Sequence, residues 1–235
     1  MRATEMAVSL FDRIEQFQEE LGHRSGGGSL TLATQDAIIL YLLPDIVRRF
    51  ALDEPDVQLR LLSRSSGNAL EMVRHGEADF AMVSRVPIAD SLSFQVVKSY
   101  EAYLLFPLGH PLLRKGRPSF ISLLNQDTMM RFPLIVPERT DPAHSRVSQA
   151  LARLGLPLNI AFEVGTIEAV KHYVSLGLGL GVVSGICLSP TDVGKVEAIE
   201  IPKDYGGTTD YGVVLRRDKF IGPALERFLG ALGLR

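Results

Sequence analysis

The sequence of 235 residues contains no tryptophan and only one cysteine, Cys187. A single cysteine cannot form a disulfide within the chain, which excludes the small disulfide-stabilised domains and fits a reducing compartment. The five histidines do not have the spacing of a zinc site, so we expect no metal site and no cofactor. We expect Cys187 to pack as a small apolar side chain.

An excess of charge of one sign is also missing. Lysine and arginine number 25 against 27 aspartate and glutamate residues, which gives a formal net charge of −2. Proteins that bind nucleic acid cluster lysine and arginine against the phosphates, so the chain by itself is predicted to bind DNA poorly. No run approaches the ~20 apolar residues that span a bilayer. The charged stretch 1–20 lacks the apolar segment of a signal peptide, and we therefore expect a cytoplasmic protein.

Motifs for the common enzyme chemistries are missing as well. No Gly-Lys-Ser/Thr phosphate-binding loop occurs, and Ser184 lacks the preceding glycine that a hydrolase nucleophile elbow requires. His110 lies in a Gly-His-Pro turn, and Asp79 fits a turn before a strand better than an acid catalyst. Because no acid and base residues group together, we expect that the chain is not an enzyme.

What the sequence does contain is an alternation of strand-like and helix-like segments. Strands are predicted at 29–34, 57–62 and 78–84, with helices between them. This βαβαβ order predicts a parallel sheet with right-handed crossovers. A second alternating α/β group begins at about residue 107. Its predicted elements, with those at the junction, are strands 92–98 and 101–106, helix 119–125, strand 133–137, helix 143–154, strand 159–164, helix 167–176 and strand 180–184.

The stretch SLGLGLGVVSG, residues 175–185, raises the question whether it binds a phosphate. A dinucleotide-binding loop places G-x-G-x-x-G after a strand and before a helix, whereas these glycines follow a predicted helix and precede a predicted strand. A helix C-terminus also carries partial negative charge and disfavours phosphate. We expect Gly177, Gly179 and Gly181 to supply a left-handed turn at the helix end and a close approach of the next strand.

The N-terminal segment has a different pattern. Apolar residues recur at alternating spacings of four and three along one helix face, and they are Ala3, Ala7, Leu10, Ile14, Phe17 and Leu21. Such a seam is typical of a coiled coil and needs a partner surface, so it predicts a dimerisation helix. An ordinary amphipathic helix packed on its own domain is the alternative. Against it stands the flexible glycine-rich stretch 22–29, which separates the helix from the α/β segments.

Several stretches together form an ordered set. They are GGGSLTLAT, LLPDIVRRFALDEPDVQLRLL, GNALEMVRHGEADFAMVS, LLFPLGHPL, FPLIVP and VKHYVSLGLGLGVVS. This set resembles the effector-binding (regulatory) domain of LysR-type transcriptional regulators over about residues 1–232. No single motif is specific, so the resemblance rests on their order. The last stretch is most similar to the sulfur-assimilation (cysteine-regulon) branch of that family.

The resemblance implies an α/β fold of two Rossmann-like subdomains joined by two crossover strands, similar to type 2 periplasmic binding proteins. It implies a linker helix and hinge over 1–27, a first subdomain of 28–106 plus 204–235, and a second of 107–203. It also implies that the full-length regulator contacts DNA through a winged helix-turn-helix that this chain lacks. The linker helix and the subdomain surfaces would then form a homodimer or homotetramer.

Ligands of two-lobed α/β domains bind at the C-terminal ends of parallel strands, where helix N-termini suit anions. The residues that come after the predicted strands or open the next helix are therefore the expected contacts with a small-molecule effector, for which an anionic metabolite is one candidate. They are Thr34, Gln35, Asp36, Ser65, Ser66, Ser84, Arg85, Thr140 and Thr166. For Asp36, Ser65, Ser66 and Thr166 the alternative is helix capping, and for Arg85 a solvated position at the rim.

By the resemblance, Gln35 and Ser84 lie where sulfur-branch regulators contact a bound anion. That branch has a hydroxyl and an amide side chain two and three positions after Gln35, where this chain has Ala37 and Ile38. A sulfate-binding set is therefore incomplete, which leaves room for a less polar or larger effector.

The function expected is effector sensing in the cleft between the two lobes, and two other classes share the fold. A type 2 periplasmic-like solute-binding protein is the first alternative, against which stand the missing signal peptide and the N-terminal seam. An enzyme such as a deaminase or dehydratase is the second, and it would need the clustered acid and base residues that the sequence does not show.

Overall fold

The structure is a computed structural model that describes residues 28–114, 116–137 and 141–234. Within these ranges the chain forms two compact α/β units, one of residues 28–98 with 210–234 and one of residues 99–209. Two strands run from one unit into the other, β4 (Leu92–Pro107) and β9 (Thr208–Arg216). The N-terminal seam, which the sequence predicts to be a dimerisation helix, lies outside the described residues.

The boundaries of the units fall inside these two strands, at Lys98/Ser99 and at Thr209/Asp210. The boundaries that the family resemblance implies are 106/107 and 203/204, near the ends of the same strands. Each of the two strands therefore contributes residues to both units.

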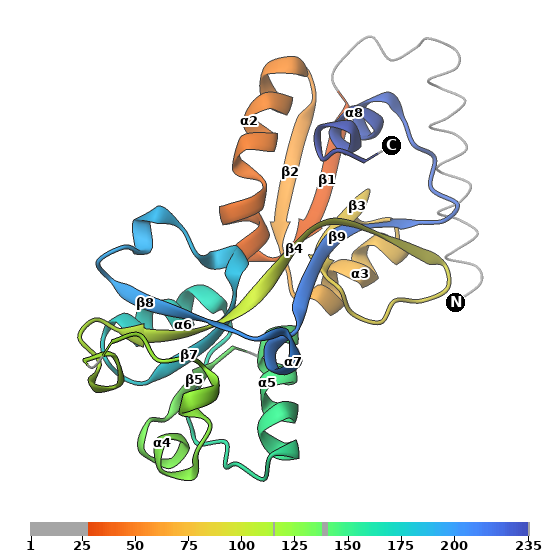
Figure 1. Cartoon of the computed structure of the whole chain (residues 1–235). Coiled ribbons are helices and arrows are strands. Elements are labelled where there is room, and N and C mark those ends of the chain that lie inside the picture. Colours follow the sequence, from red (N-terminus) through yellow and green to blue (C-terminus); the bar gives the residue numbers. More distant parts are fainter. Residues whose placement is uncertain (1–27, 115, 138–140, 235) are drawn as a thin grey trace, which may run out of the picture. The chain divides into compact units, whose positions relative to one another are not determined.

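In the first unit the sheet order is β2–β1–β3–β9 (Figure 1). β1 (Ser29–Thr34) pairs in parallel with β2 (Gln58–Ser63) and with β3 (Phe80–Ser84), whereas β9 pairs antiparallel with β3. Parallel neighbours need crossover connections, which α2 (Pro44–Asp53) and α3 (Ser66–Arg74) supply. The βαβαβ order predicted from the sequence is confirmed.

Local sequence explains where these helices begin. Pro44 occupies the first position of α2, where a missing N–H is tolerated, after a short π-helical turn at Ile38–Leu42. Ser65 caps α3, because its hydroxyl oxygen accepts a hydrogen bond from the Asn68 N–H at 3.4 Å. The C-terminal helix α8 (Pro223–Ala231) packs beside α2, with the ring centroids of Phe228 and Phe50 5.0 Å apart.

In the second unit β5 (Leu134–Val136) lies between β6 (Ile160–Glu163) and β7 (Leu180–Ser184), and both pairs are parallel. The second half of β4 pairs antiparallel with β7 on one side and with β8 (Val196–Ile201) on the other. The connections are α5 (Pro142–Arg153), between β5 and β6, and α6 (Ile167–Ser175), between β6 and β7 (Figure 1). The other helical elements are α4 (Gln126–Arg131), α7 (Lys203–Gly206) and 3-10 turns at Pro111–Leu113, Ile121–Leu123, Gly185–Cys187 and Pro190–Asp192.

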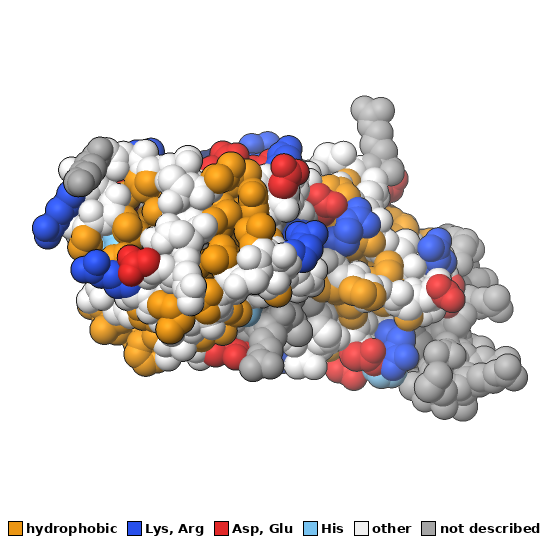
Figure 2. Space-filling model, turned by 60° about the horizontal axis from the view of Figure 1, so that its bottom comes forward, with side chains coloured by type: hydrophobic (Ala, Val, Ile, Leu, Met, Phe, Trp, Pro, Cys, Tyr) orange, Lys and Arg blue, Asp and Glu red, His pale blue; other side chains and the backbone are white. Residues whose placement is uncertain are grey.

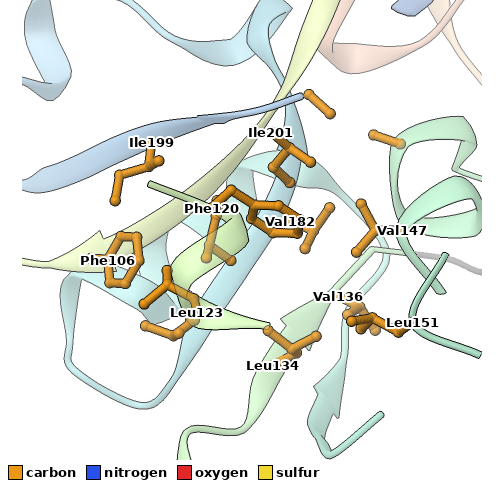
Figure 3. Close-up of a cluster of buried hydrophobic side chains, with 14 of the residues drawn as sticks. Phe106, Phe120, Leu123, Leu134, Val136, Val147, Leu151, Val182, Ile199 and Ile201 are labelled. Carbon is orange, nitrogen blue, oxygen red and sulfur yellow. The ribbon is translucent and has the colours of Figure 1, made fainter. Parts of the chain in front are cut away.

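The core of the second unit lies between its sheet and α5. Val182 of β7 lies beside Val147 of α5 and Val136 of β5 lies beside Leu151 of α5, whereas Phe106 of β4 lies on the other side of the cluster (Figure 3). All five side chains are buried, and burial of such apolar groups is the main favourable contribution to folding. Because alternate residues of a strand share a face, the even-numbered residues of β7 lie on the face that packs against α5.

Two elements differ from the sequence-based prediction. The strands predicted at 92–98 and 101–106 are one continuous strand, β4. The helix predicted at 119–125 is wrong, because only a 3-10 turn at Ile121–Leu123 forms there and α4 comes after it. The Asn125 side chain accepts a hydrogen bond from the Thr128 N–H at 2.9 Å, so a new helix starts at the point where the predicted one was to end.

The glycine stretch ends α6 and opens β7, as the sequence predicts. Gly177 has a φ of 79°, in the left-handed region that favours glycine. A Cβ atom on Gly179 would lie 2.7 Å from the carbonyl oxygen of Pro133, and one on Gly181 would lie 2.7 Å from a methyl carbon of Val170. The glycines therefore turn the chain and let β7 pack closely against β5 and α6.

Some large apolar side chains remain exposed in the second unit. Ile160 and Phe162 of β6 are among them, with Tyr173 of α6, whose ring stacks on Phe162 at a centroid distance of 6.1 Å. Figure 2 shows patches of apolar side chains beside charged ones on one face of the molecule. None of the helices in the described part of the chain is long and apolar enough to cross a bilayer.

Candidate functional site

Three of the predicted contact segments in the first unit meet at one edge of its sheet. Thr34, Ser63 and Ser84 are the last residues of β1, β2 and β3, which run in the same direction. Thr34 is fully buried, and its hydroxyl donates a hydrogen bond to the carbonyl oxygen of Met82 at 2.7 Å. Its hydroxyl hydrogen is thus used within the sheet, and Thr34 holds β1 to β3.

Gln35 and Ser84 are joined across this edge. The Gln35 side-chain oxygen accepts a hydrogen bond from the backbone N–H of Ser84 at 2.9 Å. Only the oxygen of an amide accepts an N–H, so the contact fixes the orientation of the whole group. The Gln35 –NH₂ group, a donor, therefore points away from this hydrogen bond.

The Ser84 side chain is unusual for a buried polar group. It is 2% exposed, and its hydroxyl has no hydrogen-bond partner among the described residues. A buried hydroxyl without a partner costs about 1–3 kcal/mol, so most native structures avoid one. A group of this kind at a strand end is a candidate for contact with a ligand.

The acidic and hydroxyl residues nearby are engaged with each other or with a helix. The Ser63 hydroxyl donates a hydrogen bond to the Asp36 carboxylate. Ser65 caps α3 and Ser66 is its first residue, so the capping alternative holds for Ser65. Asp36 and Ser63 therefore lie together at the edge where β1, β2 and β3 end, and α3 begins there, directly after β2.

The positive charge of Arg85 is compensated within the first unit. Its Nε atom lies 3.0 Å from the Asp210 carboxylate, and its guanidinium carbon lies 4.4 Å from the centre of the Phe94 ring. The arginine is held over an aromatic face and paired with an acid, which fits the alternative of a charge at the rim.

In the second unit Thr166, one of the predicted ligand contacts, caps α6. Its hydroxyl oxygen accepts a hydrogen bond from the Ala169 N–H at 3.1 Å, so the capping role is established for it as well. Thr140 lies outside the described residues. A second buried hydroxyl without a partner among the described residues belongs to Ser184, the last residue of β7, which is 1% exposed.

Sequence reasoning missed a buried lysine in this unit. Lys171 of α6 is 7% exposed, and its Nζ donates to the carbonyl oxygen of Cys187 at 2.7 Å. The same ammonium lies 2.9 Å from an Asp192 carboxylate oxygen and 3.3 Å from a Glu168 carboxylate oxygen. A signal was available, because Ile167, Val170, Lys171 and Val174 share one apolar stripe of α6 and a charge in such a stripe needs a buried partner.

Burial and the Lys171 ammonium shift the pKa values of two neighbouring groups, the Asp192 carboxyl and the Cys187 thiol. Burial opposes ionisation of Asp192, but hydrogen bonds from Lys171 and Ser189 outweigh it and lower the pKa of this carboxyl. Burial raises the pKa of the Cys187 thiol well above its usual value, so Cys187 is a packed thiol and not a nucleophile. The group is a structural ion cluster that holds α6 to the turns after β7.

The start of α5 contributes one more charged group. Asp141 caps the helix, and its carboxylate accepts a hydrogen bond from the His144 N–H at 3.0 Å. Burial raises the pKa of Asp141, against the opposing effects of the His144 and Ala143 N–H groups and of the Arg146 charge. Arg146, one turn further along, donates from Nη1 to the Thr209 hydroxyl at 3.3 Å.

These groups bind and orient but do not form a catalytic set. Among the described carboxylates, Asp36 accepts a hydrogen bond from Ser63, Asp141 caps a helix, and Asp192 and Asp210 form ion pairs. Within the described ranges no group of three or more His, Cys, Asp or Glu side chains is arranged to hold a metal ion. These side chains can form hydrogen bonds to a ligand through their hydroxyl and amide groups.

Solved structures share this fold. The cofactor-binding domain of the Cbl transcriptional regulator matches with a TM-score of 0.77 and 24% identity, over 88% of this chain and 89% of that one. The effector-binding domain of QuiR in complex with shikimate matches with a TM-score of 0.73 and 15% identity, over 88% of this chain and 95% of that one. The two-unit architecture is therefore that of the LysR effector-binding domains, as the sequence predicts.

Curated relatives give the same result. The chain is 31% identical over 159 residues to the HTH-type transcriptional regulator cbl of Escherichia coli K12, and 29% identical over 165 residues to CysB of Burkholderia cenocepacia. The alignments cover 67% and 69% of this chain but 48% and 50% of those proteins, so the chain spans about half the length of the curated relatives it matches.

The likeness to Cbl and CysB confirms the predicted branch of the family. The same relatives are transcriptional regulators, which confirms the expectation that the chain is not an enzyme. The model of the LysR substrate binding domain matches residues 23–234. The chain belongs to the LysR substrate-binding domain family.

Proposed function

We propose that this chain senses a small-molecule effector for a LysR-type transcriptional regulator. The effector would bind at the C-terminal ends of the parallel strands, where the sequence predicts its contacts. The proposal is supported by the family, by relatives solved with shikimate and with benzoate, and by the C-terminal strand edge as the usual binding position of such folds.

One observation carries this proposal more than any other. The buried Ser84 hydroxyl has no partner among the described residues, and the adjacent Gln35 amide is oriented with its donor group away from the sheet. A ligand oxygen placed against both would satisfy the hydroxyl and use the amide. The free energy that the unpartnered hydroxyl costs the empty domain would then favour the bound state.

The wider assembly is suggested by the length of the relatives. Because the chain spans about half of them, we propose that the complete regulator also carries a DNA-binding domain, a winged helix-turn-helix, and that this domain alone contacts DNA. Residues 1–27 would serve as linker helix and hinge, and the protein would be a cytoplasmic homodimer or homotetramer.

Effector binding would act by shifting an equilibrium between arrangements of the units. A ligand can shift such an equilibrium only by its differential affinity for the two states, typically ~1–3 kcal/mol. The change in arrangement would alter the packing of subunits and so the spacing of their DNA-binding domains.

A thermal-shift screen tests the proposal. The compounds should include sulfate, shikimate, benzoate, small aliphatic carboxylates, amino acids and nucleotides, each added to the whole chain. A ligand at about 100 times its Kd adds ~2.7 kcal/mol to the stability, which is a clear rise in melting temperature. Binding without turnover supports an effector domain, and failure of every compound to bind would contradict the proposal.

A type 2 periplasmic-like solute-binding protein remains the alternative, because it shares the fold. The two differ in assembly, since a solute receptor of this kind acts as a monomer. A dimer that survives dilution in analytical ultracentrifugation favours the regulator, and a monomer at all concentrations favours the receptor.

A further inference from the structure

The turn that follows β4 in the second unit is built around His110. β4 ends at Pro107, and the chain then turns at Gly109, whose φ of 70° lies in the left-handed region. The His110 N–H donates to the Pro107 carbonyl oxygen at 3.3 Å, and Pro111 opens the 3-10 turn that follows. The side chain does not point into solvent, because only 9% of His110 is exposed. The Gly-His-Pro turn therefore carries a buried titratable group.

Two aromatic rings hold the imidazole of His110. Its centroid lies 5.4 Å from that of Phe106, near the end of β4, and 4.7 Å from that of Phe132, directly after α4. Phe106 is fully buried, and Phe132 packs against the apolar cluster of the same unit. The imidazole therefore joins the turn after β4 to the strand and to the end of α4.

One nitrogen of this ring is used by the backbone. Nδ1 of His110 accepts a hydrogen bond from the Leu112 N–H at 3.3 Å and so caps the 3-10 turn Pro111–Leu113. An imidazole nitrogen accepts a hydrogen bond only while it carries no proton, so the neutral ring has its proton on Nε2. An imidazolium carries a proton on both nitrogens. The cap and the charged form of the ring therefore exclude each other.

Charged side chains on the surrounding elements do not compensate an imidazolium at this position. Counted along the chain or across the strand register, the nearest ones are Glu101 of β4, Glu197 of β8, Arg114 after the 3-10 turn, and Asp127 and Arg131 of α4. Glu101 is an odd number of residues from Phe106 and lies on the other face of β4. Glu197 lies opposite Phe106 but forms no ion pair with His110.

The cation closest to the aromatic contacts opposes a second positive charge. The guanidinium carbon of Arg131 lies 5.5 Å from the centre of the Phe132 ring, so this ring already interacts with one cation. Burial is thus the dominant effect on the His110 ring, and it lowers the pKa of His110 below its ordinary value of 6.5.

We propose that His110 is an acid-sensitive lock of the second unit: protonation of its imidazole removes the cap of the turn Pro111–Leu113 and releases this turn from Phe106 and Phe132. The lock lies within one unit and involves no effector, so it is separate from effector sensing. Its role is to make the packing of the segment after β4 depend on pH.

The direction of the effect follows from proton binding. A base whose pKa is lower in the folded state than in the unfolded state binds its proton more readily when the chain unfolds. The contribution of neutral His110 to stability is therefore fully present well above pH 6.5. It falls as the pH drops below about 6.5, until the pH reaches the folded-state pKa.

Melting temperatures of the whole chain between pH 7.5 and pH 5.0 test the lock. In His110→Asn the side-chain oxygen can still cap the turn, but the residue does not titrate. We expect wild type to lose about 3 °C more than His110→Asn over this range, whatever their difference at pH 7.5. His172→Gln is the matched control, because this histidine is exposed on α6 of the same unit, and it should lose as much as wild type. Equal losses in wild type and His110→Asn overturn the proposal.

Amide hydrogen exchange of wild type, followed by NMR, tests the local release without any variant. The protection factor of the Leu112 N–H, which compares its exchange with that of an unstructured chain at the same pH, should fall about tenfold between pH 7.5 and pH 5.0. The Ala169 N–H is the control, because it is capped by the Thr166 hydroxyl, which does not titrate. Constant protection of Leu112, or an equal fall at Ala169, overturns the lock, since the second result means that acid loosens the whole unit.

Discussion

Lys171 and Asp192 form an ion pair inside the second unit, with Nζ 2.9 Å from a carboxylate oxygen and the lysine side chain 9% exposed. The two residues come from α6 and from the 3-10 turn at Pro190–Asp192, after β7. Their contact, with the hydrogen bond from Lys171 to the Cys187 carbonyl, joins α6 to the turns that follow β7.

Replacing the lysine tests this role. Lys171→Met leaves Asp192 and Glu168 without their shared cation and the Cys187 carbonyl without its donor. Removal of one partner from a buried ion pair typically costs 3–5 kcal/mol, so we expect a loss of about 3 kcal/mol in the free energy of unfolding. Urea denaturation measures it. Lys195→Met, at an exposed position nearby, should change the stability by less than about 0.5 kcal/mol.

The lowered pKa of Asp192 predicts how stability changes in acid. A carboxyl with a folded-state pKa below its ordinary value of 3.8 contributes stability that is present above that value. The contribution is lost as the pH falls through the folded-state pKa. We expect wild type to be more stable than Asp192→Asn at pH 7 and the gap to shrink below about pH 4.

Urea denaturation of both proteins between pH 7 and pH 3 checks this prediction. Asp204→Asn is the control, because this carboxyl is exposed and its replacement should give a difference that hardly varies with pH. A gap between wild type and Asp192→Asn that is constant with pH, or that widens in acid, contradicts the role given to the ion pair.

Glycine at position 181 is predicted to be a packing requirement. Gly181→Ala would place a Cβ atom 2.7 Å and 2.9 Å from methyl carbons of Val170 and Val174 in α6. The helix must move away from β7, and we expect a loss of about 1–3 kcal/mol in unfolding free energy. Gly165→Ala is the matched control, because no heavy atom lies within 4 Å of the added Cβ and its φ is not in the left-handed region. Equal stability of the two variants would contradict the packing role.

Patterns that depend on neighbouring residues in the sequence predicted most of the fold. The buried strands β1, β3 and β7 are short apolar runs, and the helices α3 and α6 have a capping residue and an apolar stripe within ten residues. The helix predicted at 119–125 failed because the choice between a 3-10 turn and an α-helix depended on one cap, Asn125. Local propensity did not resolve that choice.

The site was predicted less well, because its properties arise between residues distant in sequence. Arg85 is paired with Asp210, 125 residues further along the chain, and nothing near either residue signals the pair. Likewise, whether the Ser84 or Ser184 hydroxyl finds a partner depends on the strands beside it. The sequence places a serine at each strand end, but only the packed sheet shows that neither hydroxyl has a described partner.

The orientation of Gln35 gives the last prediction. In Gln35→Glu the carboxylate still accepts the Ser84 N–H, so the fold and the end of β3 remain as they are. The variant loses the –NH₂ donor and gains a negative charge beside the proposed effector oxygen. We expect the affinity for an oxygen-bearing effector found by the thermal-shift screen to fall at least tenfold, with less than about 1 kcal/mol change in stability. Gln58→Glu, an exposed change of the same kind on β2, should leave the affinity unchanged. Titration calorimetry measures both, and an unchanged affinity in Gln35→Glu would show that the effector does not touch the end of β1.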